Sequence, residues 1–222
     1  MSTYASTYDR AAGGRAIERD ARALLGQVMG YVAATLGFAA LGAYLGRDLS
    51  GGAGLLFFLG TFAAIVGLNV AVSRGREQLA IGLLFGLGLL LGLAVAPVIS
   101  DYAGADPSAL WQAAGATAAF VAAFGAFGYA TRRDLSAWVR PLFWALLALI
   151  GFGLVAIFVA IPGANVIYAV AGLVIFGGFT IIDFNRLRQG DEDSAVLIAS
   201  SIFLDVFNVF LLLLDLFGGA RD

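Results

Sequence analysis

A single carboxylate interrupts the long apolar segment near the carboxyl end of the chain. Residues 200–216 read SSIFLDVFNVFLLLLDL, and Asp205 lies in the middle. An aspartate at the centre of a membrane helix costs roughly 2.5–3.5 kcal/mol on insertion scales. We therefore expect Asp205 to have a partner, a proton or a water-filled path. The alternative is a purely structural hydrogen bond.

The polar residues of this segment recur at helical spacing. At about 100° per residue, five of them share a face about 80° wide: Ser194, Ser201, Asp205, Asn208 and Asp215. Such a stripe should face protein or water rather than lipid. The segment is therefore predicted to form the central helix of a bundle, with Ser201 and Asn208 supporting Asp205. Asp215 is close enough to the end of the segment to be simply solvated.

Asp183, in the preceding apolar segment (GGFTIIDFNRLRQG), is the candidate partner of Asp205. Two adjacent carboxylates in a low dielectric cannot both ionise cheaply, so they would share a proton and sense pH. When both are ionised, their oxygens would suit a hard cation such as Ca²⁺. Their positions in the chain predict depths that differ by several ångströms, so contact between them stays open. Asp183 could instead only flank its helix near water.

Arg74 is a candidate competitor for that cation. It ends another apolar segment, and a guanidinium can form a bidentate pair with a carboxylate. The alternative is an ordinary positively charged residue at the cytoplasmic surface.

The composition indicates an integral membrane protein. Of the 222 residues, 61% are hydrophobic and 13% charged, and the mean hydropathy is +0.92. A membrane helix needs about 20 largely apolar residues. Seven windows qualify, which predicts an all-α bundle of seven transmembrane helices: 25–46, 53–73, 79–100, 109–131, 137–161, 164–186 and 194–217. The fifth and sixth windows are separated only by residues 162–165, so one long segment is an alternative.

The arginines predict the orientation of the bundle. Eleven of the thirteen fall in the amino-terminal tail and in the second, fourth and sixth loops, and only Arg47 and Arg221 fall on the other side. Because cytoplasmic loops retain positive charge, the amino terminus is predicted to be cytoplasmic and the carboxyl terminus outside.

The residues that are absent exclude several kinds of chemistry. The chain has no cysteine, no histidine and no lysine. These absences argue against thiolate and imidazole metal sites, cysteine nucleophiles and Schiff-base cofactors. Two membrane aspartates could also form an intramembrane aspartyl protease, but the GxGD pattern of that class is missing. We expect no enzyme, no required cofactor and no nucleic-acid partner.

Small residues and a polar tail complete the pattern. Gly82 with Gly86, and Gly88 with Gly92, form two GxxxG spacings that predict close helix packing. Residues 1–24 are polar and are predicted to form a flexible cytoplasmic tail before the bundle of residues 25–222, with a helix near AIERDARALL as an alternative.

Several dispersed motifs together resemble the transmembrane Bax inhibitor motif family. They are SIFLDVFNVFLLLLDLFG, IIDFNRL, FGYATRRDLS and LGLAVAPVIS, and the resemblance runs from the first span to the carboxyl end. It implies six helices around the last one and a pH-dependent Ca²⁺ leak regulated by an aspartate dyad on Asp183 and Asp205. Arg74 matches an arginine that can pair with an aspartate in bacterial members.

The resemblance also implies an alternative function and a location. Some bacterial relatives are similar to proteins that bind and modulate a membrane-bound protease complex, and the tail would then bind the partner. The arginine-only, Ala/Gly-rich composition fits a bacterial cell (inner) membrane. Asp215 departs from the family pattern, since many members have arginine there, which leaves ion selectivity open.

Overall fold

The computed structural model describes residues 2–49, 51–189 and 194–219, with side chains from residue 22 onward except at residue 51. These residues form seven long helices, each apolar enough to cross a membrane, and a short 3₁₀ turn. They are α1 (Ser2–Leu45), α2 (Gly51–Ser73), α3 (Glu77–Ala105), α4 (Pro107–Ala130), η1 (Ser136–Trp138), α5 (Val139–Phe158), α6 (Ala164–Gln189) and α7 (Ala195–Gly219). The predicted seven-helix bundle is confirmed.

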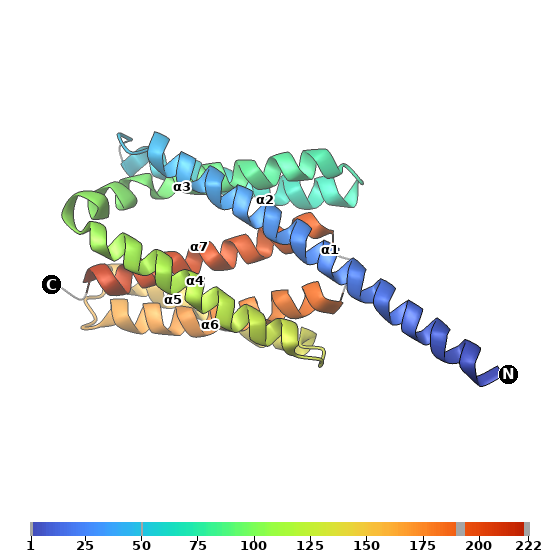
Figure 1. The fold of residues 1–222 in the computed structure, drawn as a ribbon. Coiled ribbons are helices and arrows are strands. Elements are labelled where there is room, and N and C mark those ends of the chain that lie inside the picture. Colours follow the sequence, from blue (N-terminus) through green and yellow to red (C-terminus); the bar gives the residue numbers. More distant parts are fainter. Residues whose placement is uncertain (1, 50, 190–193, 220–222) are drawn as a thin grey trace.

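Successive helices run in opposite directions across the bundle. The connections from α2 to α3, from α4 to α5 and from α6 to α7 lie at one end, and the other connections lie at the opposite end (Figure 1). The two termini consequently lie at opposite ends of the molecule. This arrangement gathers the loops that carry most of the arginines at the end from which α1 enters.

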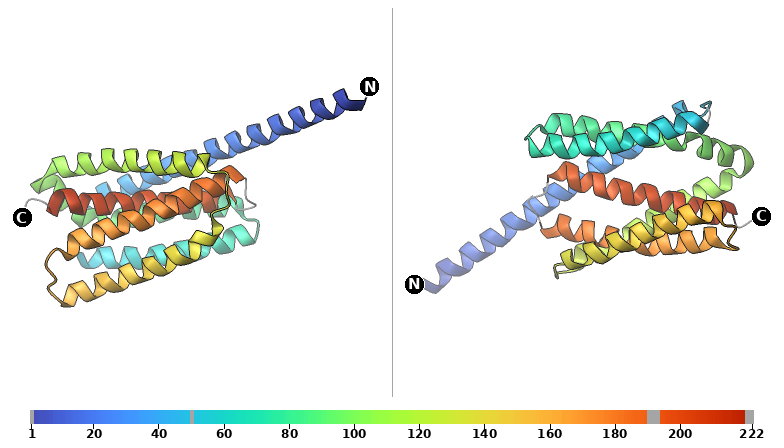
Figure 2. Two further views of the ribbon diagram at one scale, coloured as in Figure 1. Left: turned by 90° about the horizontal axis from the view of Figure 1, so that it is seen from below. Right: turned by 180° about the vertical axis from the view of Figure 1, so that it is seen from behind.

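Helix α7 lies between two groups of helices. In Figures 1 and 2, α1, α2 and α3 lie on one side of it and α4, α5 and α6 on the other. It contacts α1, α2, α3, α4 and α6, whereas α5 packs on the outer side of α6. Buried residues such as Phe203 and Val209 make α7 the most buried of the seven spans. Its central position agrees with its polar stripe, which should face protein or water rather than lipid.

Only one of the two predicted glycine pairs packs closely. A Cβ atom at Gly92 would clash with the backbone oxygen of Ala39, and one at Gly88 would lie 2.8 Å from the Thr35 side chain. These glycines let α1 and α3 approach closely. Gly82 and Gly86 meet nothing within 4 Å, so their spacing reflects composition and not a helix contact.

Local signals set the helix ends that position the later spans. Asp106 caps α4, accepting a hydrogen bond from the Ser108 backbone at 3.2 Å, and Pro107 follows at the first helical position. Gly163 has a φ of +73° between α5 and α6. Because glycine adopts this conformation without steric cost, the chain reverses there. The alternative of one long segment is therefore wrong.

The segment predicted as a flexible tail is helical in the structure. Helix α1 begins at Ser2, whereas its membrane-crossing part begins at Arg22. Alanine, arginine and glutamate, which favour helices, dominate residues 11–24. The amino-terminal part of α1 therefore continues beyond the bundle as a helix (Figure 1).

Candidate functional site

Asp205 lies in the buried middle of α7. Its side chain is 5% exposed, and its neighbours along the helix include the buried residues Ile202, Phe203 and Phe207. One carboxyl oxygen, Oδ2, has no hydrogen-bond partner among the described residues. A buried oxygen without a partner is costly, so the sequence-based expectation that Asp205 is not an ordinary core residue agrees with its surroundings.

Asp183 lies on the adjacent helix α6 and is 4% exposed. Its charge acts on the carboxyl group of Asp205, and among the described side chains no arginine is found to act there. Helices α6 and α7 are packed against each other. The structure thus places the two aspartates on adjacent, packed helices, close enough for the charge of Asp183 to act on Asp205.

Thr180 is a third member of this site that the sequence analysis missed. Its hydroxyl interacts with the carboxyl group of Asp205 and also donates to the backbone oxygen of Phe176 at 2.8 Å. A hydroxyl has one proton, so it donates to only one of these acceptors at a time. One feature of the sequence could have identified Thr180: it lies three residues before Asp183, and this spacing places both residues on one face of α6.

The two supporting residues on α7 are half-buried. The Asn208 side chain donates to the backbone oxygen of Leu204 at 2.7 Å, within its own helix. Ser201 is half-buried one turn before Asp205. Both lie on the face of Asp205, whereas the interactions found for its carboxyl group within the described residues are with Thr180 and Asp183.

Arg74 is exposed in the turn between α2 and α3. Within the described part of the chain, no ion pair joins it to Asp205. Its turn lies at the end of the bundle that α1 enters (Figure 1). The structure therefore separates Arg74 from the buried carboxyl of Asp205, with which the sequence analysis paired it.

Asn185 holds α6 against the end of α4. It is 1% exposed and donates to the backbone oxygens of Thr131 and Gly128 at 2.8 and 3.4 Å. Arg188 also donates to the oxygen of Thr131, at 2.9 Å. These bonds satisfy carbonyl groups at the end of α4 that the helix itself leaves open. They fix α6 two residues beyond Asp183.

Comparison with known proteins identifies the family of this chain. A family model described as "Inhibitor of apoptosis-promoting Bax1" matches residues 21–222. The chain belongs to the Bax inhibitor family. The expected family resemblance is confirmed, and the match begins where the membrane-crossing part of α1 begins.

Bacterial and viral relatives align with about three quarters of this chain. Inner membrane protein YbhL of Escherichia coli (strain K12) is 28% identical over 181 residues, covering 75% of this chain and 76% of that protein. Golgi anti-apoptotic protein of Vaccinia virus (strain Lister) is 32% identical over 173 residues, covering 77% and 71%. A Helicobacter pylori (strain ATCC 700392 / 26695) protein is 29% identical over 168 residues, covering 75% and 72%. With its seven spans, this Bax inhibitor family member is a multi-pass bacterial membrane protein that lies in the lipid bilayer.

The buried pair in this family member is suited to proton sharing and to transient contact with a cation. In the described ranges, no group of three or more Asp, Glu, His or Cys side chains lies together. Ca²⁺ takes about six to eight oxygen ligands. Two carboxylates and one hydroxyl supply fewer, so a Ca²⁺ ion at this site would keep part of its water.

Proposed function

We propose that this protein is a pH-sensitive Ca²⁺ leak channel or transporter gated by Asp183 and Asp205. The observation that carries the proposal is the interaction of two buried carboxyl groups on adjacent helices, at membrane depth. Buried ionisable groups inside a bundle commonly mark ion paths and proton relays. We propose no catalysed reaction and no resident cofactor for this protein.

The proposed gate works through the protonation state of the pair. When the two carboxyls share a proton, their repulsion is relieved and α6 and α7 remain packed. When both are ionised, repulsion favours a looser arrangement, and the oxygens attract Ca²⁺. The proton and the cation thus favour different arrangements of the same two helices, which is what a two-state gate requires.

Arg74 enters the proposal as a closing partner. It lies exposed in the turn between α2 and α3, so it would have to move inward to pair with an ionised aspartate. Such a pair would offset part of the repulsion between the ionised carboxyls, so it would lower the Ca²⁺ flux at high pH and compete directly with Ca²⁺.

Ca²⁺ flux into dye-loaded proteoliposomes between pH 5 and pH 8 tests the gate. Asp183→Asn and Asp205→Asn keep the size of each side chain and remove its charge, so each should change the flux and flatten its pH dependence. Asp215→Asn is the matched control, because Asp215 is half-buried on the same helix but is not part of the pair. If both variants gave the same pH profile of Ca²⁺ flux as the parent protein, in proteoliposomes verified to contain folded protein, the proposed gate would be wrong.

We also propose that the amino terminus is cytoplasmic and the carboxyl terminus outside. Eleven of the thirteen arginines support this orientation. Reporter fusions active on one side of the membrane only, placed at each terminus, test it. A carboxyl-terminal fusion active in the cytoplasm would contradict it.

A second candidate function is binding to a membrane-protein partner such as a protease complex. It is favoured by the helical part of α1 that continues beyond the bundle (Figure 1), because this helix offers a partner a preformed surface. Deletion of residues 2–20 should abolish capture of a membrane-protease complex and leave the bundle folded. Capture that survives the deletion would exclude recognition through this helix.

A further inference from the structure

A large cavity lies between α1 and α4, and α3, α7 and Phe184 of α6 form the rest of its wall. Its volume is about 910 Å³. Helices α1 and α4 are not packed against each other in the part of the chain that the structure describes. Small side chains keep the space between them open, among them Ala40 on α1 and Ala118 and Ala122 on α4.

The cavity opens sideways between two membrane-crossing helices. Ala40, Ala118 and Ala122 line it and are nevertheless exposed. Because α1 and α4 both cross the membrane, this opening lies at the depth of the lipid tails. A molecule that enters it from the side therefore comes from the bilayer.

The lining offers almost nothing to water. The hydroxyl of Thr117 donates to the backbone oxygen of Ala113 at 2.7 Å, and that of Ser100 donates to the backbone oxygen of Arg47 at 3.3 Å. A water molecule inside a protein needs about two to four polar partners. An apolar chain fits this lining, and the volume lies within the roughly 300–1,000 Å³ typical of pockets for small ligands.

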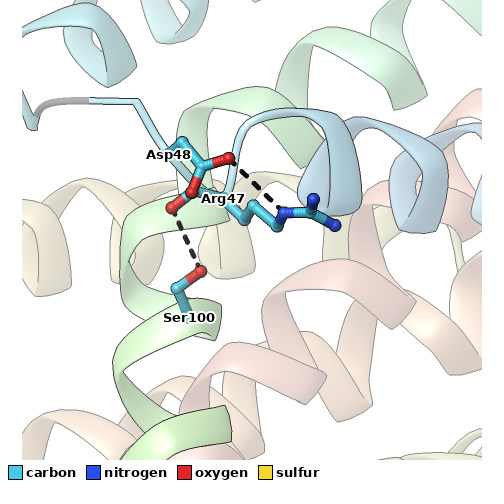
Figure 3. A network of polar contacts seen from close by, with 3 residues as sticks. All are labelled: Arg47, Asp48 and Ser100. Atoms are coloured by element: carbon cyan, nitrogen blue, oxygen red, sulfur yellow. Dashed lines mark hydrogen bonds and ion pairs between the residues drawn. The ribbon is translucent and has the colours of Figure 1, made fainter.

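One end of the cavity carries a cation. Arg47 and Tyr44 both line it, and the guanidinium carbon lies 4.4 Å from the centre of the Tyr44 ring. The Nε atom of Arg47 pairs with Asp48 at 3.4 Å, while its two terminal nitrogens point away from Asp48 (Figure 3). The bond from Ser100 holds the Arg47 backbone in place. An arginine and a tyrosine at the end of a span are typical of the membrane surface.

We propose that this cavity is a phospholipid site that holds one acyl chain between α1 and α4 and binds the anionic phosphate headgroup through Arg47. The site is independent of the proposed Ca²⁺ gate, because neither aspartate lines it. Its lining does include Phe184 and Val206, the residues that follow Asp183 and Asp205. A bound chain therefore packs against both helices that carry the pair.

The headgroup provides the selectivity of this site. An acyl chain that moves from the bilayer into the cavity exchanges one apolar environment for another, so this transfer contributes little to the free energy of binding. An arginine near the membrane surface favours an anionic lipid by about fivefold. The site should consequently prefer a net-anionic phospholipid over a zwitterionic one with the same tails.

Native mass spectrometry of the full-length protein with dioleoyl phosphatidylglycerol and dioleoyl phosphatidylcholine as probes tests the proposal. The parent protein should retain one lipid and prefer phosphatidylglycerol about fivefold. Arg47→Gln should remove that preference and keep the retained lipid. Arg76→Gln is its control, because Arg76 is exposed away from the cavity.

Ala118→Phe and Ala40→Phe test the acyl-chain part of the site. Each places a ring in the open part of the cavity, where the replaced residue is exposed, and each should reduce retention of both lipids. Ala148→Phe on α5 is the matched control, since Ala148 is exposed but does not line the cavity. Circular dichroism and thermal unfolding confirm that the compared variants are folded.

Three outcomes would overturn the proposal. They are equal retention of both lipids by the parent protein, unchanged retention in both phenylalanine variants, and a lipid-free dimer whose cross-links join the cavities of two copies. The last outcome would assign the cavity to a second copy of the chain.

Discussion

The hydroxyl of Thr180 on α6 interacts with the carboxyl group of Asp205 on α7 and also lies 2.8 Å from the backbone oxygen of Phe176. The proton of this hydroxyl has two alternative acceptors. When Asp205 is ionised, the hydroxyl proton favours its carboxylate. When Asp205 is protonated, the hydroxyl keeps its bond to the backbone oxygen of Phe176. Thr180 therefore responds to the protonation state of Asp205 without titrating itself.

Replacing Thr180 with valine should move the pH at which Ca²⁺ flux changes upward by about one to two units. A hydrogen bond to a charged group contributes roughly 1.5–3 kcal/mol, and one pH unit corresponds to about 1.4 kcal/mol. Losing the donor disfavours the ionised form, so deprotonation needs a higher pH. Thr180→Ser retains the hydroxyl and should keep the parent midpoint. Identical midpoints for Thr180→Val and the parent protein would exclude this role.

Replacing Arg74 with glutamine should raise Ca²⁺ flux several-fold at pH 8 and change it little at pH 5. The guanidinium is the proposed partner of the ionised pair, and at low pH the shared proton already relieves the repulsion. Arg76→Gln, in the same exposed turn, is the matched control for the loss of one positive charge. Equal Ca²⁺ flux from the two variants at pH 8 would show that Arg74 is an ordinary cytoplasmic charge and not a partner of the aspartates.

Gly92→Ala should destabilise the bundle by about 1–3 kcal/mol, which is typical of overpacking in a well-packed interior. The new Cβ atom would meet the backbone oxygen of Ala39, which cannot rotate away. Gly86→Ala, in the same helix, meets nothing within 4 Å and should be neutral or slightly stabilising. Denaturant unfolding in detergent compares the two, and equal stabilities would contradict the proposed contact between α1 and α3.

Asp134 provides a pH-dependent contact outside the membrane. The backbone N–H and the hydroxyl of Ser136 donate to its carboxylate at 2.8 and 3.0 Å and lower its pKa below the ordinary 3.8. The folded pKa is depressed, so the contribution of this contact is complete above the unfolded pKa and is lost as pH falls through the folded one.

Ser136→Ala should raise the pKa of Asp134 toward its ordinary value while leaving the backbone bond in place. Titration of the carboxyl carbon of Asp134 by NMR measures this change. An unchanged pKa in the variant would show that the hydroxyl contributes nothing.

The membrane class and the helix order were predictable because they depend on local properties of the chain. Continuous apolar length specifies a span, and the capping residue Asp106 and the reversal at Gly163 mark ends that are visible in sequence. The buried position of Asp205 was also predictable, since its polar stripe recurs at the helical period. Thr180 was not identified, because its partner lies on a different helix.

The sequence by itself determined that the chain is a seven-span membrane protein with two unusual aspartates, because composition, periodicity and span length are properties of consecutive residues. Only the tertiary structure decided that Asp183 interacts with Asp205, that Arg74 lies apart from Asp205, and that a cavity separates α1 from α4. These relationships depend on the rotation and depth of whole helices. Rotation and depth are set by side-chain packing between segments that lie far apart in the chain.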